Sequence, residues 1–334
     1  MAPAFLRLMA WGIEGETRRW RGAVARRPRR WFRRLSVCAL GGSLLAACSG
    51  SEVTHLPPGP GDAKRGEKIA ALAGGCGCHS AETGAPLSGE RELPTPFGTF
   101  YSSNLTPDRE TGLGAWTDEE IDTALRRGRL RDGTTEAPVM PWYAYAGMAD
   151  DDARDLIAWL RTLEPVRRQR RADEIWIPLP RLAFRAWVIL FSRFTTPPRS
   201  APSEPHARGR YLVDHVAICG DCHTPRTVFG SPDRSLAFAG NAQGPFDEVV
   251  PNITPNKVTG IGNWTADDIV SVLEMGMLPN MDSVSGLMAE LVDGVHGAPG
   301  YAQAPLADLR AMAEYLRTVR PIAHAVRDSG AGDD

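Results

Sequence analysis

Two cysteines and a histidine stand close together in the segment Cys219-Gly-Asp-Cys222-His223. Two thiols three positions apart, followed directly by a histidine, form the spacing that attaches a c-type haem. Each sulfur bonds one vinyl group of the porphyrin, and the His223 imidazole becomes the proximal ligand of the iron. A redox dithiol or half of a zinc site also uses such a pair, but zinc needs a second ligand pair. The other close cysteine pair also precedes a histidine, which favours haem.

That second motif, Cys76-Gly-Cys78-His79, is one residue shorter. Arg65 and Arg208 each lie 11 positions before the first cysteine of their motif, so the contraction falls between the two thiols. Three interpretations remain. Both sulfurs bond the porphyrin through a strained loop, only Cys78 bonds it, or this half of the chain has lost its haem. We predict that the haem is present and that Cys78 is bonded, because the sequence after this motif is intact.

An internal repeat indicates the architecture. The segment Asn-Leu-Thr-Pro-Asp-Arg-Glu-Thr-Gly-Leu-Gly-Ala-Trp over 104–116 returns as Asn-Ile-Thr-Pro-Asn-Lys-Val-Thr-Gly-Ile-Gly-Asn-Trp over 252–264, at an offset of 148. A duplication this close indicates two copies of one structural unit. Trp116 and Trp264 either pack on the haem edges and donate an indole N–H to a propionate, or they are ordinary core aromatics.

The same offset selects the sixth iron ligands. A c-type haem that carries electrons commonly has methionine opposite its histidine, and the thioether raises the potential. The candidates in the first half are Met140 and Met148; in the second half they are Met275, Met277, Met281 and Met288. Met140 and Met288 are the pair that keeps the offset of 148, and each follows its tryptophan by 24 positions. We predict that these two methionines bind the irons.

The N-terminus is typical of an export signal. Residues 1–34 contain ten arginines and two glutamates, and an apolar run over 35–47 ends in Leu-Ala-Ala-Cys48. This ending resembles a bacterial lipobox, in which the cysteine is acylated and becomes the first residue of the mature protein. The alternative is an ordinary signal peptide whose removal leaves Cys48 as a free thiol. Covalent haem attachment takes place outside the cytoplasmic membrane, so we expect a periplasmic protein anchored to the membrane by lipid.

Length and charge agree with this interpretation. The chain has 334 residues, 43% of them hydrophobic, which suffices for two small domains. Without residues 1–47 it holds 28 basic and 38 acidic residues, a net charge of −10. Such a surface does not suit nucleic acid, and it does suit a partner that docks through basic residues.

The remaining pattern predicts helices and long loops, and therefore an all-α protein. Asp62, Thr117 and Thr265 are expected to cap helices, the last two through capping boxes. The carbonyl of Pro225 is expected to accept the Nδ1 proton of His223. Trp176 and Trp187 indicate that the segment between the halves packs against both of them. The predicted divisions are a signal peptide (1–47), a tether (48–60), cytochrome domain 1 (61–165), a packed linker (166–205), cytochrome domain 2 (206–322) and a tail (323–334).

These motifs resemble the diheme cytochrome c family, particularly the cytochrome subunits of periplasmic dehydrogenases for alcohols, aldehydes and sugar acids. The similarity covers nearly all of residues 60–322 and includes Thr224-Pro225-Arg226 after the second motif. It implies two class I cytochrome folds in tandem, two covalent haems, His/Met coordination, and a role for Arg226 beside the haem. It further implies a protein without catalytic residues that passes electrons from a dehydrogenase to the respiratory chain. The contracted motif departs from the family pattern, as does the presence of two motifs where many alcohol-oxidising relatives have three.

Two enzymatic alternatives stay open. A diheme peroxidase needs one iron with an open or displaceable distal position, and His296 lies near Met288 in the sequence. A thiosulfate-oxidising cytochrome would need an additional cysteine ligand, to which nothing in the sequence points.

Overall fold

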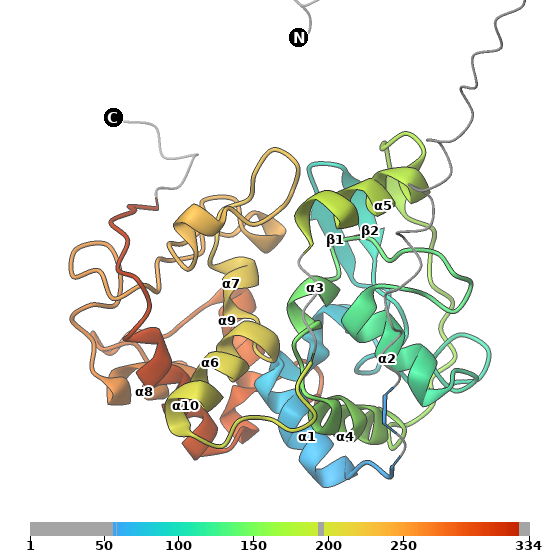
Figure 1. Ribbon diagram of the computed structural model, residues 1–334, viewed down its shortest axis with the longest axis horizontal. Helices are drawn as coiled ribbons and strands as arrows, with labels where there is room; N and C mark the ends of the chain where they lie inside the picture. The colour runs from blue at the N-terminus through green and yellow to red at the C-terminus, as the bar shows by residue number, and fades with distance from the viewer. Residues whose placement is uncertain (1–55, 58, 193–196, 327–334) are drawn as a thin grey trace, which may run out of the picture. The chain divides into compact units, whose positions relative to one another are not determined.

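The computed structural model describes residues 56–57, 59–192 and 197–326 (Figure 1). The predicted signal peptide and Cys48 lie outside these residues. The described residues belong to one compact unit, so the division into two cytochrome domains stays a prediction. In the part of the chain that the structure describes, no helix has the length and apolar character needed to cross a bilayer.

Helices dominate the first half, and their ends follow the expected signals. The Asp62 carboxylate accepts the backbone N–H groups of Lys64 and Arg65 at the start of α1. Thr117 and Glu120 form the expected capping box at the start of α2, which ends at Gly128 in the left-handed conformation. The elements are α1 (Ala63–Leu72), the 3₁₀ segment η1 (Gly74–His79), α2 (Asp118–Arg127), α3 (Trp142–Tyr145) and α4 (Asp150–Leu160).

The second half repeats much of this order. Thr265 and Asp268 form the expected capping box of α8, which ends at the left-handed Gly276. The elements are α6 (Pro205–His215), α7 (Cys219–Cys222), η2 (Arg234–Leu236), η3 (Pro245–Asp247), α8 (Ala266–Met275), α9 (Gly286–Asp293), η4 (Tyr301–Gln303) and α10 (Leu306–Leu316).

The first and last helices of each half cross at a glycine. Helix α1 packs on α4, and α6 packs on α10 (Figure 1). A Cβ on Gly66 would lie 1.9 Å from the Asp155 carbonyl oxygen, and one on Gly209 would lie 1.9 Å from that of Ala311. Gly66 and Gly209 directly follow Arg65 and Arg208. Each glycine lets two helix backbones touch, which explains why it precedes its motif at the same distance in both halves.

Backbone pairing preserves the repeat offset. An isolated bridge joins Arg129 to Thr135, and its counterpart joins Met277 to Ser283, each 148 positions later. The Gly128 carbonyl accepts the N–H of residue 136, just as the Gly276 carbonyl accepts that of residue 284. The segments leading to Met140 and to Met288 thus begin from equivalent turns.

A small antiparallel sheet corrects the expectation of an all-α protein. Strands β1 (Glu92–Thr95), β2 (Gly98–Tyr101) and β3 (Glu174–Ile175) pair in that order, with Leu93 opposite Phe100 and Thr99 opposite Glu174. Strands of two to four residues are too short to show a period of two. The third strand also comes from the linker, far along the sequence, so its pairing is a tertiary effect.

The linker contacts both halves through β3 and α5 (Pro180–Phe191). The Trp187 indole donates to the Phe229 carbonyl at 2.9 Å, and its ring lies 5.4 Å from that of Tyr143. Trp176 donates to the Pro96 carbonyl at 3.1 Å but stays 67% exposed, so the expectation that packing would bury this ring is wrong.

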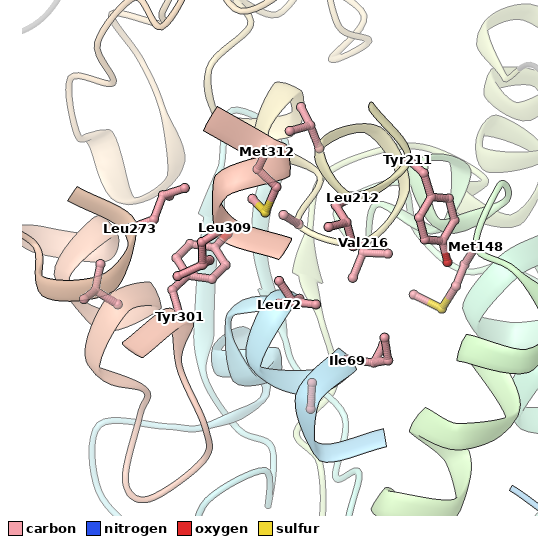
Figure 2. Close-up of a cluster of buried hydrophobic side chains, with 14 of the residues drawn as sticks. Ile69, Leu72, Met148, Tyr211, Leu212, Val216, Leu273, Tyr301, Leu309 and Met312 are labelled. Atoms are coloured by element: carbon pink, nitrogen blue, oxygen red, sulfur yellow. The ribbon is translucent and has the colours of Figure 1, made fainter. Parts of the chain in front are cut away.

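One buried cluster draws on both halves. Ile69 and Leu72 of α1 belong to the same set of side chains as Leu212 and Val216 of α6 and Met312 of α10 (Figure 2). Leu72, Leu212 and Met312 have no exposed surface. This shared core holds the two motif-bearing segments in fixed positions.

The helix crossings give a first prediction. Gly66→Ala should lower the free energy of unfolding by about 1–3 kcal/mol, because the new methyl group overlaps the α4 backbone. Chemical denaturation of the holoprotein measures the change. Gly59→Ala is the control, since its Cβ would meet only the flexible Arg154 side chain at 3.7 Å. Equal effects of the two substitutions would contradict the crossing argument.

Candidate haem sites

Both motifs face one cavity of about 2510 Å³. It exceeds the roughly 300–1,000 Å³ typical of a site for one small molecule. The sequence-predicted residues that line it are Cys76, Cys78, His79, Trp116, Met140, Cys219, Cys222, His223, Arg226, Trp264 and Met288. The structure therefore brings every predicted haem-contacting residue to the wall of one cavity.

A backbone carbonyl holds each proximal imidazole. Nδ1 of His79 lies 2.8 Å from the Ser103 carbonyl oxygen, and Nδ1 of His223 lies 2.7 Å from that of Pro251. With Nδ1 donating, Nε2 keeps the lone pair that binds iron. The expected acceptor for His223, the Pro225 carbonyl, instead accepts the Asp233 N–H at 2.8 Å. The repeat could have identified these acceptors, since Ser103 and Pro251 are 148 positions apart and so occupy equivalent places in the two halves.

The asparagine that follows fixes this carbonyl in each half. Asn104 Oδ1 accepts the backbone N–H and the hydroxyl of Thr106, at 2.9 and 2.7 Å, and its amide donates to the Val166 carbonyl at 2.8 Å. Asn252 makes the same bonds to Thr254, at 2.8 and 2.7 Å, and to the Ile322 carbonyl at 2.9 Å. All four Asn and Thr side chains are buried. The hydrogen bonds within each Asn-x-Thr sequence thus hold the loop whose carbonyl contacts the motif histidine.

The two attachment turns differ in their backbone. Helix α7 forms one turn over the longer motif and follows the left-handed Ile218 (φ 45°). In the contracted motif Gly74, Gly75 and Cys76 all have positive φ, at 64°, 66° and 55°. Gly77, between the two cysteines, has no positive φ, although glycine is the residue best able to adopt one. Cys76 is the one non-glycine residue among these three, so the backbone strain falls on it.

Burial keeps the cysteines and histidines neutral. It raises the pKa of both Cys76 and Cys219 to about 12 and lowers the pKa of His79 and His223. Cys78 is open to the cavity, yet the protein around it also raises its pKa. Reactive redox thiols have lowered pKa values, so the redox-dithiol interpretation gains no support. No group of three or more His, Cys, Asp or Glu suited to a metal ion occurs among the described residues. A neutral imidazole is the form that binds iron.

Position separates the candidate methionines. Met140 precedes α3, Met288 is the third residue of α9, and both side chains are half-buried at the cavity wall. Met148 is fully buried in the core, whereas Met275, Met277 and Met281 are exposed and absent from the lining. His296 is also exposed and absent from the lining, so the geometry does not favour it as a distal group.

Two residues outside the motifs, Tyr143 and Arg91, contact groups at or near the attachment turns, and the sequence did not reveal either of them. The Arg226 guanidinium donates to the Asp221 carbonyl at 2.7 Å and to the Tyr143 hydroxyl at 2.8 Å. Arg91 forms an ion pair with Glu290 at 2.6 Å. The Arg226–Tyr143 and Arg91–Glu290 contacts join residues 83 and 199 positions apart, which no local pattern signals.

Comparison with known proteins agrees with this site. No family model matches the chain. It is 38% identical over 271 residues to a diheme cytochrome c-type protein of Cereibacter sphaeroides, which covers 78% of this chain and 87% of that protein. It is 37% identical over 267 residues to the cytochrome c subunit of an alcohol dehydrogenase (quinone) of Gluconobacter oxydans, covering 77% of this chain and 54% of that subunit. It is 33% identical over 301 residues to the fructose dehydrogenase cytochrome subunit of Gluconobacter japonicus, covering 87% of this chain and 60% of that subunit.

The chain is therefore a c-type cytochrome. It belongs to the family that contains diheme cytochromes c and the cytochrome subunits of alcohol, fructose and gluconate dehydrogenases. Members of this family bind haem c covalently and transfer electrons. The chain spans little more than half the length of the alcohol and fructose dehydrogenase subunits that it matches.

The contracted turn gives a second prediction. Cys78 adjoins His79 and opens to the cavity, so Cys78→Ser should abolish or sharply reduce covalent attachment at this motif. Cys76→Ser should leave the haem attached through the remaining thioether. Intact mass counts the bound haems, and the pyridine haemochrome band moves to longer wavelength when one vinyl survives. If the wild-type protein has the mass of one haem, and Cys76 and Cys78 can both be alkylated, haem is not attached at the contracted motif.

Proposed function

We propose that this chain is a diheme cytochrome that carries electrons in the periplasm from a dehydrogenase to an acceptor of the respiratory chain. The supporting observation is that two Cys/Cys/His/Met sets line one cavity. Two haems in one cavity provide an entry and an exit for the electron within a single chain.

Each haem, when bound, supplies a one-electron iron couple. His79 and His223 would hold the two irons, and their carbonyl partners orient the imidazoles for this role. Met140 and Met288 would supply the second ligand of each iron, and a thioether there would favour the reduced iron and raise the potential. Trp116 and Trp264 cover the cofactors and limit the access of water. The chain itself needs no proton transfer for this reaction.

The choice of partner rests on the relatives. Alcohol, fructose and gluconate dehydrogenases each have a cytochrome subunit similar to this chain. We infer that this chain likewise receives electrons from a dehydrogenase with which it associates. The excess of acidic residues in the mature sequence suits a basic docking surface on that partner.

The distal ligands give a third prediction. Met288→Ala should lower the midpoint potential of the haem at His223 and remove its sulfur-to-iron charge-transfer band, because the iron loses its thioether. Met140→Ala should do the same for the haem at His79. Spectropotentiometry measures both effects, and Met281→Ala is the control because its side chain is exposed. A band that survives Met288→Ala means that another group binds this iron.

A fourth prediction concerns the membrane. We propose that Cys48 is acylated, and two or more chains would hold the protein firmly, since each buried CH₂ contributes about 0.8 kcal/mol. Cys48→Ser should stay unprocessed or appear as a soluble protein after cell fractionation. An unmodified N-terminus on soluble wild-type protein would contradict the anchor.

A further inference from the structure

A polar cluster connects the two candidate haem sites. The Tyr143 hydroxyl donates to Asp221 Oδ1 at 2.7 Å and accepts a hydrogen bond from Arg226 at 2.8 Å. Arg226 also forms an ion pair with Asp221 at 2.7 Å. The Arg226 and Asp221 side chains are only 27% and 15% exposed. Each member therefore contacts both of the others in a largely dehydrated setting, where electrostatic interactions are strong.

The members come from different haem sites. Tyr143 lies in α3, three residues after Met140, whereas Asp221 stands between the cysteines of the other attachment turn, in α7. Nδ1 of His215, the last residue of α6, lies 2.8 Å from the Ala144 carbonyl oxygen, to which it can donate a hydrogen bond. The segment carrying one distal methionine thus rests on the attachment turn of the other haem.

A reciprocal contact joins the remaining pair of segments. Arg91 forms its ion pair with Glu290, two residues after Met288, and donates to the Gly77 carbonyl at 3.4 Å. Gly77 stands between the cysteines of the contracted motif. A Cβ on Gly74 would lie 2.3 Å from a Leu291 methyl group, which shows how closely α9 packs on this turn. Each distal segment therefore touches the opposite attachment turn.

We propose that Tyr143 and Arg226 are positioning residues that hold the Asp221 carboxylate at the Cys219–His223 turn and thereby set the midpoint potential of that haem. A carboxylate beside a haem favours the more positive, oxidised iron and lowers the potential. The guanidinium and the hydroxyl proton offset part of this charge. Because Tyr143 belongs to the Met140 segment, the potential of one haem then depends on the structure at the other. This inference rests on the proposed diheme function.

Substitutions of Asp221 and of Tyr143 should shift the midpoint potential of the haem at His223 in opposite directions. Asp221→Asn removes the negative charge and leaves Arg226 uncompensated, so the potential of the haem at His223 should rise. Tyr143→Phe keeps the ring and removes the hydroxyl proton from the carboxylate, so the same potential should fall. Spectropotentiometry of the holoprotein measures both, with the Met288→Ala variant identifying the titration step of this haem.

Tyr211→Phe is the matched control. The Tyr211 hydroxyl also donates to a carboxylate, that of Asp152 at 2.7 Å, but Asp152 does not line the cavity, whereas Asp221 does. This variant should alter stability and leave both potentials in place. Two covalent haems with an unchanged potential in Tyr143→Phe, or an equal shift in Tyr211→Phe, would overturn the positioning role. One covalent haem in the wild-type protein would instead refute the diheme function, so the two failures are distinguishable.

Discussion

The structure depends on a hydrogen bond from each motif histidine to the carbonyl that precedes a buried asparagine. Ser103 and Pro251 supply these carbonyls, and Asn104 and Asn252 fix them through bonds to Thr106 and Thr254. Each asparagine also reaches the chain after the last helix of its half, at Val166 or Ile322. One short motif therefore orients the imidazole and closes the fold around it, which accounts for its repetition at a constant offset.

A second constraint is the meeting of two haem motifs in one cavity. The contacts between Tyr143 and Asp221, and between Arg91 and Glu290, place charged groups where the two halves join. A partly buried ion pair such as Arg226–Asp221 contributes little net stability, because desolvation offsets the attraction. Its effect on a nearby redox centre does not cancel in the same way, since the two oxidation states differ by one charge. The placement of these pairs therefore suits control of potential better than stabilisation of the fold.

Much of this arrangement follows from local sequence. The caps at Asp62, Thr117 and Thr265 predict helix starts because each satisfies backbone N–H groups within three residues. The sheet, the Pro251 carbonyl and the Tyr143 cluster were missed because they depend on contacts between distant segments. The choice of Pro225 as acceptor failed through an assumption of proximity in sequence, although Ser103 and Pro251 stood at equivalent places in the repeat. The roles of Met140 and Met288 stay predictions, supported by their positions at the cavity wall.

The contracted motif shows how a shorter turn can still present its histidine equivalently. Three consecutive residues, ending at Cys76, have positive φ in the contracted motif, whereas the longer motif has only Ile218 in this conformation, immediately before its helical turn. Two of the three are glycines, for which this conformation costs little, and the cost at Cys76 is of order 1 kcal/mol or more. His79 nevertheless reaches the Ser103 carbonyl at 2.8 Å, close to the 2.7 Å of His223. The Ser103 carbonyl, in the loop held by Asn104, thus sets the position of the imidazole. The linkage between the cysteines can vary without moving this histidine.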